Sequence, residues 1–360
     1  MSPTRARQTG LQLVTGAATL ALLAALTVPA ARTLRTVAEN AGPGAVRAPV
    51  GSAHPRRVFG IYVDPWHAGD WAHAVGATPQ ALATFEAFSR NRTLRRLQGE
   101  ATRRGVRRLL VSWEPWTPVQ SALGVAAQAK PQRGMRNIDI ARGAQDRYII
   151  RFARSLARFP GTVYLRFAHE MNGYWYPWSR DPVAYRWAWR RVVRLFRSVG
   201  ARNVRFVWSV NPNLYESAPR WRAGLRPYWP GRKFVDLVGT TVINFGGSKD
   251  YAVRRFAPRL AELHRRFAKP VVLAETNTAE DGAALWLRDL RRMLAGMPWV
   301  RGVFWSQLPS RGKVQQMGTG TLDWDIRQDP QASAELAALI HDGASANADS
   351  PIAHRHRPAP

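Results

Sequence analysis

The feature that most constrains this chain is a regular alternation of short apolar runs with longer, arginine-rich amphipathic stretches. From Thr162 onward the apolar runs recur about every 30 to 40 residues, the length of one strand followed by one helix. This repeat predicts a parallel sheet covered by helices. The 360 residues suffice for one large barrel or for two modest domains.

Seven runs are predicted as strands because they are short, apolar and rich in β-branched or aromatic residues. They are Val58–Val63, Val106–Trp113, Thr162–Phe167, Val204–Val210, Phe234–Val242, Pro270–Ala274 and Val300–Trp305. Amphipathic stretches predict helices at Pro79–Arg90, Gln145–Arg158, Pro182–Val199, Tyr251–Phe267 and Ala283–Leu294. An eighth strand is expected between Asp64 and Val106, but that stretch has only helix-like sequence, from Ala81 to Arg104.

One strand that ends in a histidine and a carboxylate carries the main functional signal. The apolar residues Val163–Leu165 lead into the segment Arg166–Glu170, and four aromatic residues follow within Tyr174–Trp178. A carboxyl group desolvated at the end of a buried strand stays protonated near neutral pH, and flat rings offer stacking faces to sugars. Cleavage of a glycosidic bond requires this combination. The alternative is that Glu170 pairs with a nearby arginine and the rings fill a core.

The segment around His169 and Glu170 closely resembles the signature of glycoside hydrolase family 26, whose best-known members are endo-β-1,4-mannanases on a (β/α)8 barrel. A second segment, Lys269–Glu275, is similar to a later strand of that family that ends in a glutamate. The similarity runs from about Val58 to about Ile340. It implies an α/β fold, a (β/α)8 TIM barrel in a single domain, with one strand poorly defined.

The resemblance implies that Glu170 is the general acid/base and Glu275 the nucleophile of a retaining glycosidase. That mechanism needs two carboxyl groups about 5–5.5 Å apart, one protonated and one ionised. About three strand–helix units separate the glutamates, so they follow non-adjacent strands and meet at the carboxyl ends of the barrel. Strand alternation puts Arg166 on the face of Glu170, where it is expected to hold Glu275 ionised. The alternative is an ion pair of Arg166 with Asp64 or Glu114.

Four ring-bearing side chains are predicted to bind the substrate: His169, Trp113, Trp175 and Trp305. By the resemblance, His169 lies beside the sugar, and Trp175 and Trp305 match aromatic platform positions next to the scissile bond. Trp113 ends another strand and is expected to build the wall of a distal subsite. Core packing is the alternative for a tryptophan at a strand end, such as Trp305.

Polar residues near other strand ends also have structural alternatives. Glu275 taken alone is also compatible with a helix N-cap or a loop carboxylate. Asn211 and Asn213 either donate to sugar hydroxyls or form Asx turns. No second histidine follows His169 at helical spacing, so no metal site is predicted. We expect no cofactor, and the absence of cysteine excludes disulfides and thiolate-bound metals.

Two positions depart from the family pattern. The strand before the nucleophile carries an Asp-x-Tyr pattern in the family, whereas this chain has Thr241 and Ile243 there. Loss of a phenol donor near the nucleophile costs about one to three orders of magnitude in rate, by analogy with other lost transition-state hydrogen bonds. Tyr62 on the first strand is the candidate replacement. The departure bears on mannan specificity more than on glycoside cleavage.

The two ends of the chain predict export and a flexible tail. Residues 1–31 contain Arg5 and Arg7 followed by an apolar run, as in a signal peptide or an N-terminal membrane anchor. Residues 32–56 are predicted as a linker, 57–342 as the glycoside hydrolase barrel and 343–360 as a disordered tail. The protein is therefore expected to be secreted or anchored outside the cytoplasm.

The net charge of +29 comes from arginine, since only five residues are lysine. The basic residues are scattered over predicted helix surfaces and no nucleic-acid module is recognisable, so nucleic acid is not the expected partner. Solvated helix faces explain most of the charge, and an acidic polysaccharide or an anionic membrane is the alternative. The main hypothesis is an exported retaining endo-β-glycosidase acting on β-mannan or a related polysaccharide. The competing hypothesis is an inactive barrel that binds a cell-surface or exopolysaccharide.

Overall fold

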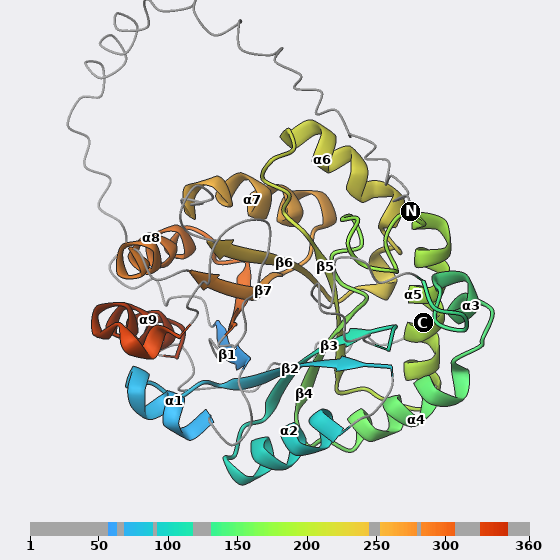
Figure 1. The fold of residues 1–360 in the computed structure, drawn as a ribbon, viewed down its shortest axis with the longest axis horizontal. Helices are drawn as coiled ribbons and strands as arrows, with labels where there is room; N and C mark the ends of the chain where they lie inside the picture. The colour runs from blue at the N-terminus through green and yellow to red at the C-terminus, as the bar shows by residue number, and fades with distance from the viewer. Residues whose placement is uncertain are drawn as a thin grey trace, which may run out of the picture. The chain divides into compact units, whose positions relative to one another are not determined.

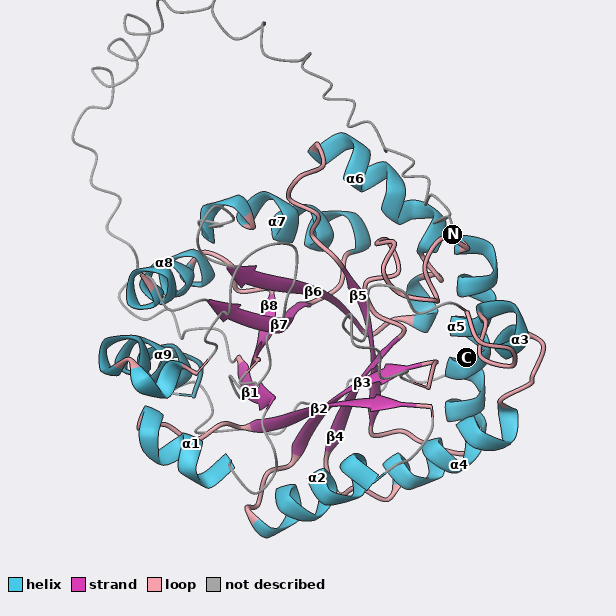
Figure 2. Ribbon diagram, viewed as in Figure 1, coloured by secondary structure: helices cyan, strands magenta, loops and turns pink. Residues whose placement is uncertain are grey.

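The chain folds into a closed barrel of eight parallel strands. The computed structural model describes residues 57–62, 68–88, 92–117, 131–244, 253–278, 282–306 and 325–344. The strands close in sequence order, from β1 to β8, and β8 pairs with β1. Helices surround the strands, as Figure 1 and Figure 2 show. The predicted (β/α)8 TIM barrel is confirmed.

Strands and helices alternate along the described chain. The strands are β1 (Val58–Tyr62), β2 (Ala81–Ala87), β3 (Arg108–Glu114), β4 (Thr162–Phe167), β5 (Val204–Val210), β6 (Leu237–Asn244), β7 (Val271–Thr278) and β8 (Val300–Trp305). The α-helices are α1 (Ala68–Val75), α2 (Arg92–Arg103), α3 (Asn137–Ala141), α4 (Asp146–Ala157), α5 (Pro182–Ser198), α6 (Ala218–Leu225), α7 (Ala257–Phe267), α8 (Ala283–Ala295) and α9 (Pro330–Ala344). Short 3-10 helices lie at Arg226–Tyr228, Arg232–Phe234, Val253–Arg255 and Ile326–Gln328.

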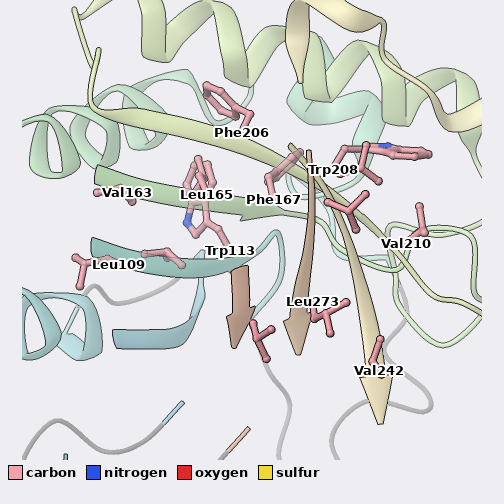
Figure 3. Packing of buried hydrophobic residues seen from close by; sticks show 14 of the residues in the cluster. Leu109, Trp113, Val163, Leu165, Phe167, Phe206, Trp208, Val210, Val242 and Leu273 are labelled. Atoms are coloured by element: carbon pink, nitrogen blue, oxygen red, sulfur yellow. The ribbon is translucent and has the colours of Figure 1, made fainter. Parts of the chain in front are cut away.

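Alternate residues of each strand face two different layers. The main hydrophobic cluster includes Leu109 and Val111 of β3 and Leu165 of β4, together with buried residues of the helices. Figure 3 labels Leu109 and Leu165 among its strand residues. Smaller clusters fill the barrel interior, one of them around Phe304 and Tyr62. The interior is therefore packed with side chains at its amino-terminal end, as in other barrels of eight strands.

The prediction of a helix over Pro79–Arg90 was wrong, because Ala81–Ala87 form β2. Helix-favouring alanines mark this segment, but the barrel interior requires small side chains there. A Cβ on the neighbouring Gly60 would lie 2.5 Å from the ring of Phe304 and 3.0 Å from Cβ of Ala81. Close packing inside the barrel thus overrides local helix propensity. β2 is the eighth strand, and it pairs in parallel with β1 and β3.

The other predicted elements are present with shifted ends. β6 begins at Leu237, three residues after the predicted start, and β7 continues beyond Glu275 to Thr278. α5 begins as its sequence predicts, since Pro182 occupies the first turn and the side chain of Asp181 accepts a hydrogen bond from Ala184 N. The helix predicted from Tyr251 consists of a 3-10 turn and α7, and its first two residues lie outside the described chain.

The predicted leader, the predicted linker and residues 345–360 lie outside the described residues. α9 includes Gly343 and Ala344, so the barrel domain extends two residues into the predicted tail. Within the described part of the chain, no helix combines the length and the hydropathy that a membrane span requires. The described ranges also contain no group of three or more acidic, histidine or cysteine side chains placed to hold a metal ion.

Candidate active site

The chain leaves β4 through two residues in the left-handed conformation. Ala168 has a φ of 44° and Glu170 a φ of 53°, which is unfavourable for residues other than glycine. Backbone hydrogen bonds to both neighbouring strands hold this segment, from Ala168 N to Trp113 O at 3.0 Å and from Glu170 N to Ser209 O at 2.8 Å. The strained turn therefore fixes Glu170 at the carboxyl end of the barrel.

A β-bulge in β7 turns Glu275 toward the barrel interior. Val272 and Ala274 face the interior and Leu273 faces the helices, so regular alternation would point Glu275 outward. The pairing with β6 skips one residue, since Thr240 pairs with Leu273 and the next residue, Thr241, pairs with Glu275. One extra residue in a strand re-aims the following side chain, and such bulges are common beside active sites.

Arg166 lies at the centre of the site, fully buried inside the barrel. Its guanidinium donates to Glu275 Oε2 at 3.0 Å, Ser209 Oγ at 3.0 Å, Ser112 Oγ at 3.2 Å and Thr241 Oγ1 at 3.3 Å. The expected contact between Arg166 and Glu275 is therefore present. Four partners from four strands fix the plane of this guanidinium.

The same guanidinium also faces Glu170. Arg166 Nη2 lies 4.0 Å from Glu170 Oε1, and the hydroxyl of Thr241 donates a hydrogen bond to that carboxylate oxygen. The side chain of Glu170 is 9% exposed and that of Glu275 is 18% exposed. Glutamates 105 residues apart in sequence thus converge on one buried cation.

Opposing effects set the charge state of Glu275. Burial raises the pKa of Glu275 above its ordinary value. The charge of Arg166 and its hydrogen bond lower that pKa, while the nearby Glu170 raises it. The arginine therefore favours an ionised Glu275 against the cost of burial.

His169 immediately precedes Glu170 and is held among aromatic rings. Its Nε2 lies 3.0 Å from the hydroxyl of Tyr176, and its carbonyl oxygen accepts a hydrogen bond from Trp178 Nε1 at 2.7 Å. The ring of Phe85 packs beside it, with the ring centroids 5.9 Å apart. Burial lowers the pKa of His169 well below its ordinary value, so the imidazole is neutral near pH 7.

The three predicted substrate-binding tryptophans lie in different environments. Trp175 is half-buried in the segment after β4, and its ring covers Gly173, where a Cβ would come within 2.6 Å. Trp113 is fully buried and stacks on Phe152 of α4, with the ring centroids 4.3 Å apart (Figure 3 labels Trp113). Trp305 is also fully buried, in the main hydrophobic cluster.

Neither Trp113 nor Trp305 is exposed in this structure, so the predicted subsite wall and sugar-binding floor stay predictions. Strand alternation gives the reason for the burial of Trp113: Ser112 contacts Arg166 in the interior, so the next residue faces the helices. Trp305 likewise follows Phe304, which fills the barrel interior. Position at a strand end did not reveal which face each ring takes.

Glu114 is a third carboxyl at this end of the barrel. It ends β3, two residues beyond Ser112, and 8% of it is exposed. Its carboxylate accepts a hydrogen bond from Trp116 Nε1 at 3.1 Å. Burial raises the pKa of Glu114 to about 7, although that hydrogen bond opposes the shift. The alternative of a Glu114–Arg166 ion pair is not observed, and the other proposed partner, Asp64, lies outside the described residues.

Sequence reasoning missed Ser112, Ser209 and Tyr176. The two serines bind Arg166 from within otherwise apolar strands. A small hydroxyl in the middle of a buried strand is a detectable signal, because such a group needs a polar partner inside the protein. Tyr176 was visible only as one of several aromatic residues, and nothing in the sequence paired it with His169.

Asn211 and Asn213 form an Asx turn, which was the structural alternative to donation to sugar hydroxyls. Asn211 Oδ1 accepts a hydrogen bond from Asn213 N at 2.8 Å, which is an Asx turn. Asn211 also exchanges two hydrogen bonds with Asn172, between its backbone and the Asn172 side-chain amide. These contacts tie the segment after β5 to the segment that carries Glu170.

Tyr62 does not take the place of a phenol beside the nucleophile. Its hydroxyl lies 2.8 Å from Ser112 Oγ and donates to the carbonyl oxygen of Ala274 at 3.2 Å. These contacts support the backbone immediately before Glu275 rather than its carboxylate. On β6, Thr241 contacts Glu170 and pairs in register with Glu275, whereas Ile243 pairs with Asn277.

A closed barrel with two glutamates at one buried arginine is an arrangement that could support cleavage of a glycosidic bond. The family model described as glycosyl hydrolase family 26 matches residues 149–255, which include Arg166 and Glu170. This match confirms the predicted resemblance to that family.

Two curated relatives match parts of the chain. Endoglucanase H of Acetivibrio thermocellus is 26% identical over 251 residues, or 66% of this chain and 25% of that protein. The β-1,3-xylanase TXYA of a Vibrio species is 27% identical over 172 residues, or 47% of this chain and 34% of that protein. The chain thus matches about a quarter to a third of the length of these relatives.

Solved structures of mannanases share the fold. A GH26 β-mannanase from Bacteroides ovatus superposes with a TM-score of 0.57 at 18% identity, covering 79% of this chain and 88% of that one. A modular endo-β-1,4-mannanase from Cellulomonas fimi gives a TM-score of 0.54 at 16% identity, covering 78% and 70%. At these identities the likeness concerns the fold alone.

Proposed function

We propose that this protein is an exported retaining endo-β-glycoside hydrolase that acts on β-mannan or a related β-linked polysaccharide. The observation that carries the proposal is the contact of one buried guanidinium with both glutamates, at 3.0 Å from Glu275 and 4.0 Å from Glu170. Retaining cleavage needs two carboxyl groups that share one bond of a bound sugar. Arg166 brings this pair together from β4 and β7.

In the proposed first step, Glu275 attacks the anomeric carbon and forms a covalent glycosyl ester. Glu170 gives its proton to the glycosidic oxygen, and the leaving sugar departs as an alcohol. Thr241 donates to one oxygen of Glu170, which leaves the other oxygen for the glycosidic bond. In the second step, Glu170 takes a proton from water, which attacks the same carbon and releases Glu275.

The proposed substrate contacts come from the segment after β4. Trp175 is half-buried there and next to Tyr174, which is 65% exposed, so both rings have faces or edges available for stacking on sugars. His169 is neutral and hydrogen-bonded to Tyr176, the residue that follows Trp175 in this segment. The related proteins bear the names of a glucanase, a xylanase and mannanases. The names of the xylanase and the mannanase specify β linkages.

The test is hydrolysis by the purified protein of mannan, mixed-linkage glucan, β-1,3-xylan and an acidic exopolysaccharide. Glu275→Ala is expected to reduce kcat by about 10⁴-fold or more, while binding of the best substrate is largely kept. Unchanged turnover in that variant would refute the assignment. Polysaccharide binding without hydrolysis by the unmodified protein would instead favour the inactive, polysaccharide-binding barrel.

A second variant addresses the acid. Glu170→Ala is expected to slow cleavage of substrates with poor leaving groups much more than cleavage of activated aryl glycosides, because only the former need a proton. Equal losses on both substrates would argue against an acid role for Glu170.

Export is part of the proposal and rests on the N-terminal sequence. Two early arginines and a following apolar run are typical of a signal peptide or an anchor. Expression of the full chain, followed by N-terminal sequencing and fractionation, would show whether it leaves the cytoplasm. A full-length protein found only in the cytoplasmic fraction would remove this element.

A further inference from the structure

A groove of about 1020 Å³ lies at the opposite end of the barrel from the two glutamates. Four successive loops line it, those that lead into β2, β3, β4 and β5. Every strand is parallel, so the beginnings of these strands mark the amino-terminal end of the barrel. The groove is therefore separate from the proposed active site.

Arginine dominates the lining of this groove, which we call the arginine groove. It contains Arg104, Arg107, Arg108, Arg202 and Arg205, and none of the described residues that line it is an aspartate or a glutamate. Arg104 is paired with Glu100. Within the described residues, no carboxylate lies at salt-bridge distance from the other four, whereas many surface arginines elsewhere have acidic partners. The groove thus concentrates uncompensated positive charge.

Apart from Arg104, two of the arginines of the groove project from strands and two lie at its rim. Arg108 begins β3 and Arg205 is the second residue of β5, and both are half-buried. Tyr164 pairs in register with Arg205, and the two guanidinium charges oppose the rise in the pKa of Tyr164 that burial causes. Arg107 and Arg202 are exposed. Charge is therefore present both in the recess and along its edges.

Hydrogen bonds between loops hold the groove in shape. The side-chain amide of Asn203 donates to the carbonyl oxygens of Leu156, Phe159 and Gly161, at 2.9, 3.0 and 3.1 Å. Thr162 N donates to the carbonyl oxygen of Arg107 at 2.9 Å. A Cβ on Gly161 would come within 2.1 Å of that same oxygen, so the two loops pack as closely as their backbones allow. A preorganised site loses less entropy on binding.

We propose that the arginine groove binds a polysaccharide that carries carboxylate groups. Guanidinium groups bind carboxylates through paired hydrogen bonds, and repeated acidic sugars match several arginines along one recess. Thr78 and Gln80 add neutral polar groups to the lining, which suit sugar hydroxyls. This site is independent of the hydrolase activity proposed above.

Two other anionic partners fit less well. A membrane-docking surface usually pairs cations with apolar side chains that enter the lipid. The large exposed hydrophobic residues of the described chain are Tyr174, Val183, Trp187, Tyr215 and Leu285, and none of them lines the groove. Binding of single-stranded nucleic acid likewise uses exposed aromatic rings, but the one aromatic residue in the lining, Phe159, is 5% exposed.

The experiment measures binding of the full chain carrying Glu275→Ala to polygalacturonate and to the same polymer with its carboxyl groups reduced. We expect binding to the acidic polymer that weakens with added salt, and weak binding to the reduced polymer. The variant Arg107→Ser/Arg202→Ser should lose at least about tenfold in affinity, because each lost charge-assisted hydrogen bond contributes to binding. Both positions are exposed, so folding should be retained.

The matched control is Arg147→Ser/Arg151→Ser, which removes the same charge from exposed positions on α4 outside the groove. It should change affinity less than about twofold. An equal loss in both double variants would overturn the proposal in favour of diffuse charge attraction. Equal binding of the reduced polymer would also overturn it. So would tighter, groove-dependent binding to phosphatidylglycerol vesicles or duplex DNA. Hydrolysis in the Glu275 background is not measured, so failure here leaves the active-site proposal intact.

Discussion

The hydroxyl of Thr241 on β6 donates a hydrogen bond to Glu170, which follows β4, although β5 lies between these two strands. Thr241 also accepts a hydrogen bond from Arg166 at 3.3 Å and pairs in register with Glu275. One threonine thus connects the arginine to the proposed acid, while the arginine contacts the proposed nucleophile directly. We call this chain of hydrogen bonds, from Arg166 through the uncharged Thr241 to Glu170, the relay. In the family pattern this position carries aspartate, so an uncharged residue in the relay is a property of this chain.

Replacing Thr241 with valine tests the relay. Valine has nearly the same shape but no hydroxyl, so the variant loses the hydrogen bond to Glu170 and the acceptor for Arg166. Because hydrogen bonds to charged groups contribute about 1.5–3 kcal/mol, kcat/KM should fall about ten- to a hundredfold. Thr241→Ser keeps the hydroxyl and should retain most of the activity. Equal activity of the valine and serine variants would show that the relay does not position the acid.

The pH dependence of the rate reports on Glu275. Only the ionised carboxylate can attack the sugar, so kcat/KM should fall as acid protonates Glu275. Because burial raises its pKa above the ordinary 4.5, this fall should begin at a higher pH than for an exposed glutamate. Arg166 lowers the pKa, so Arg166→Gln should move the acid limb to still higher pH.

Arg166→Lys is the control for this shift, since it keeps a positive charge and should move the acid limb less. Arg166 is fully buried, so circular dichroism must show that both variants are folded. An acid limb that stays at the same pH in folded Arg166→Gln would contradict the electrostatic role of the arginine.

The two tryptophans Trp113 and Trp175 should respond in opposite ways. Trp113 packs between β3 and α4, so Trp113→Ala should lower the free energy of unfolding by about 3–5 kcal/mol and leave KM of the folded protein nearly unchanged. Trp175 is half-buried beside the proposed site, so Trp175→Ala should raise KM with a smaller loss of stability. Denaturant unfolding and steady-state kinetics on both variants provide the comparison. A raised KM in folded Trp113→Ala would support a substrate role for that residue.

The strand–helix repeat and the position of Arg166 were predictable from sequence because both follow from local patterns. Short apolar runs at the spacing of a strand–helix unit define the barrel, and alternation along β4 puts Arg166 in its interior. Convergence of Glu170 and Glu275 followed once each was placed at the carboxyl end of a parallel strand.

Three features were not predictable in the same way: the direction of Trp113, the strand β2 and the bulge in β7. The bulge appears only in the pairing of β7 with β6, and without it Glu275 would face the helices. β2 is a strand because the barrel needs small residues beside Phe304, although its own sequence favours a helix. The direction of Trp113 depends on which face of β3 carries Ser112. Each of these features is set by contacts between distant segments.

Ile243 offers a gain-of-function test of the departure from the family pattern. It lies two residues after Thr241 on β6, half-buried, and pairs in register with Asn277 of β7. Alternation puts it on the face of Thr241, so a tyrosine there would carry a phenol toward the carboxyl end of the barrel near Glu275. If a missing donor limits the rate, Ile243→Tyr should raise kcat/KM at least about tenfold on the best substrate. Ile243→Phe adds the ring without the hydroxyl and should give no such gain. Equal gains in the two variants would assign the effect to packing, and no gain in Ile243→Tyr would mean that another group already stabilises the transition state.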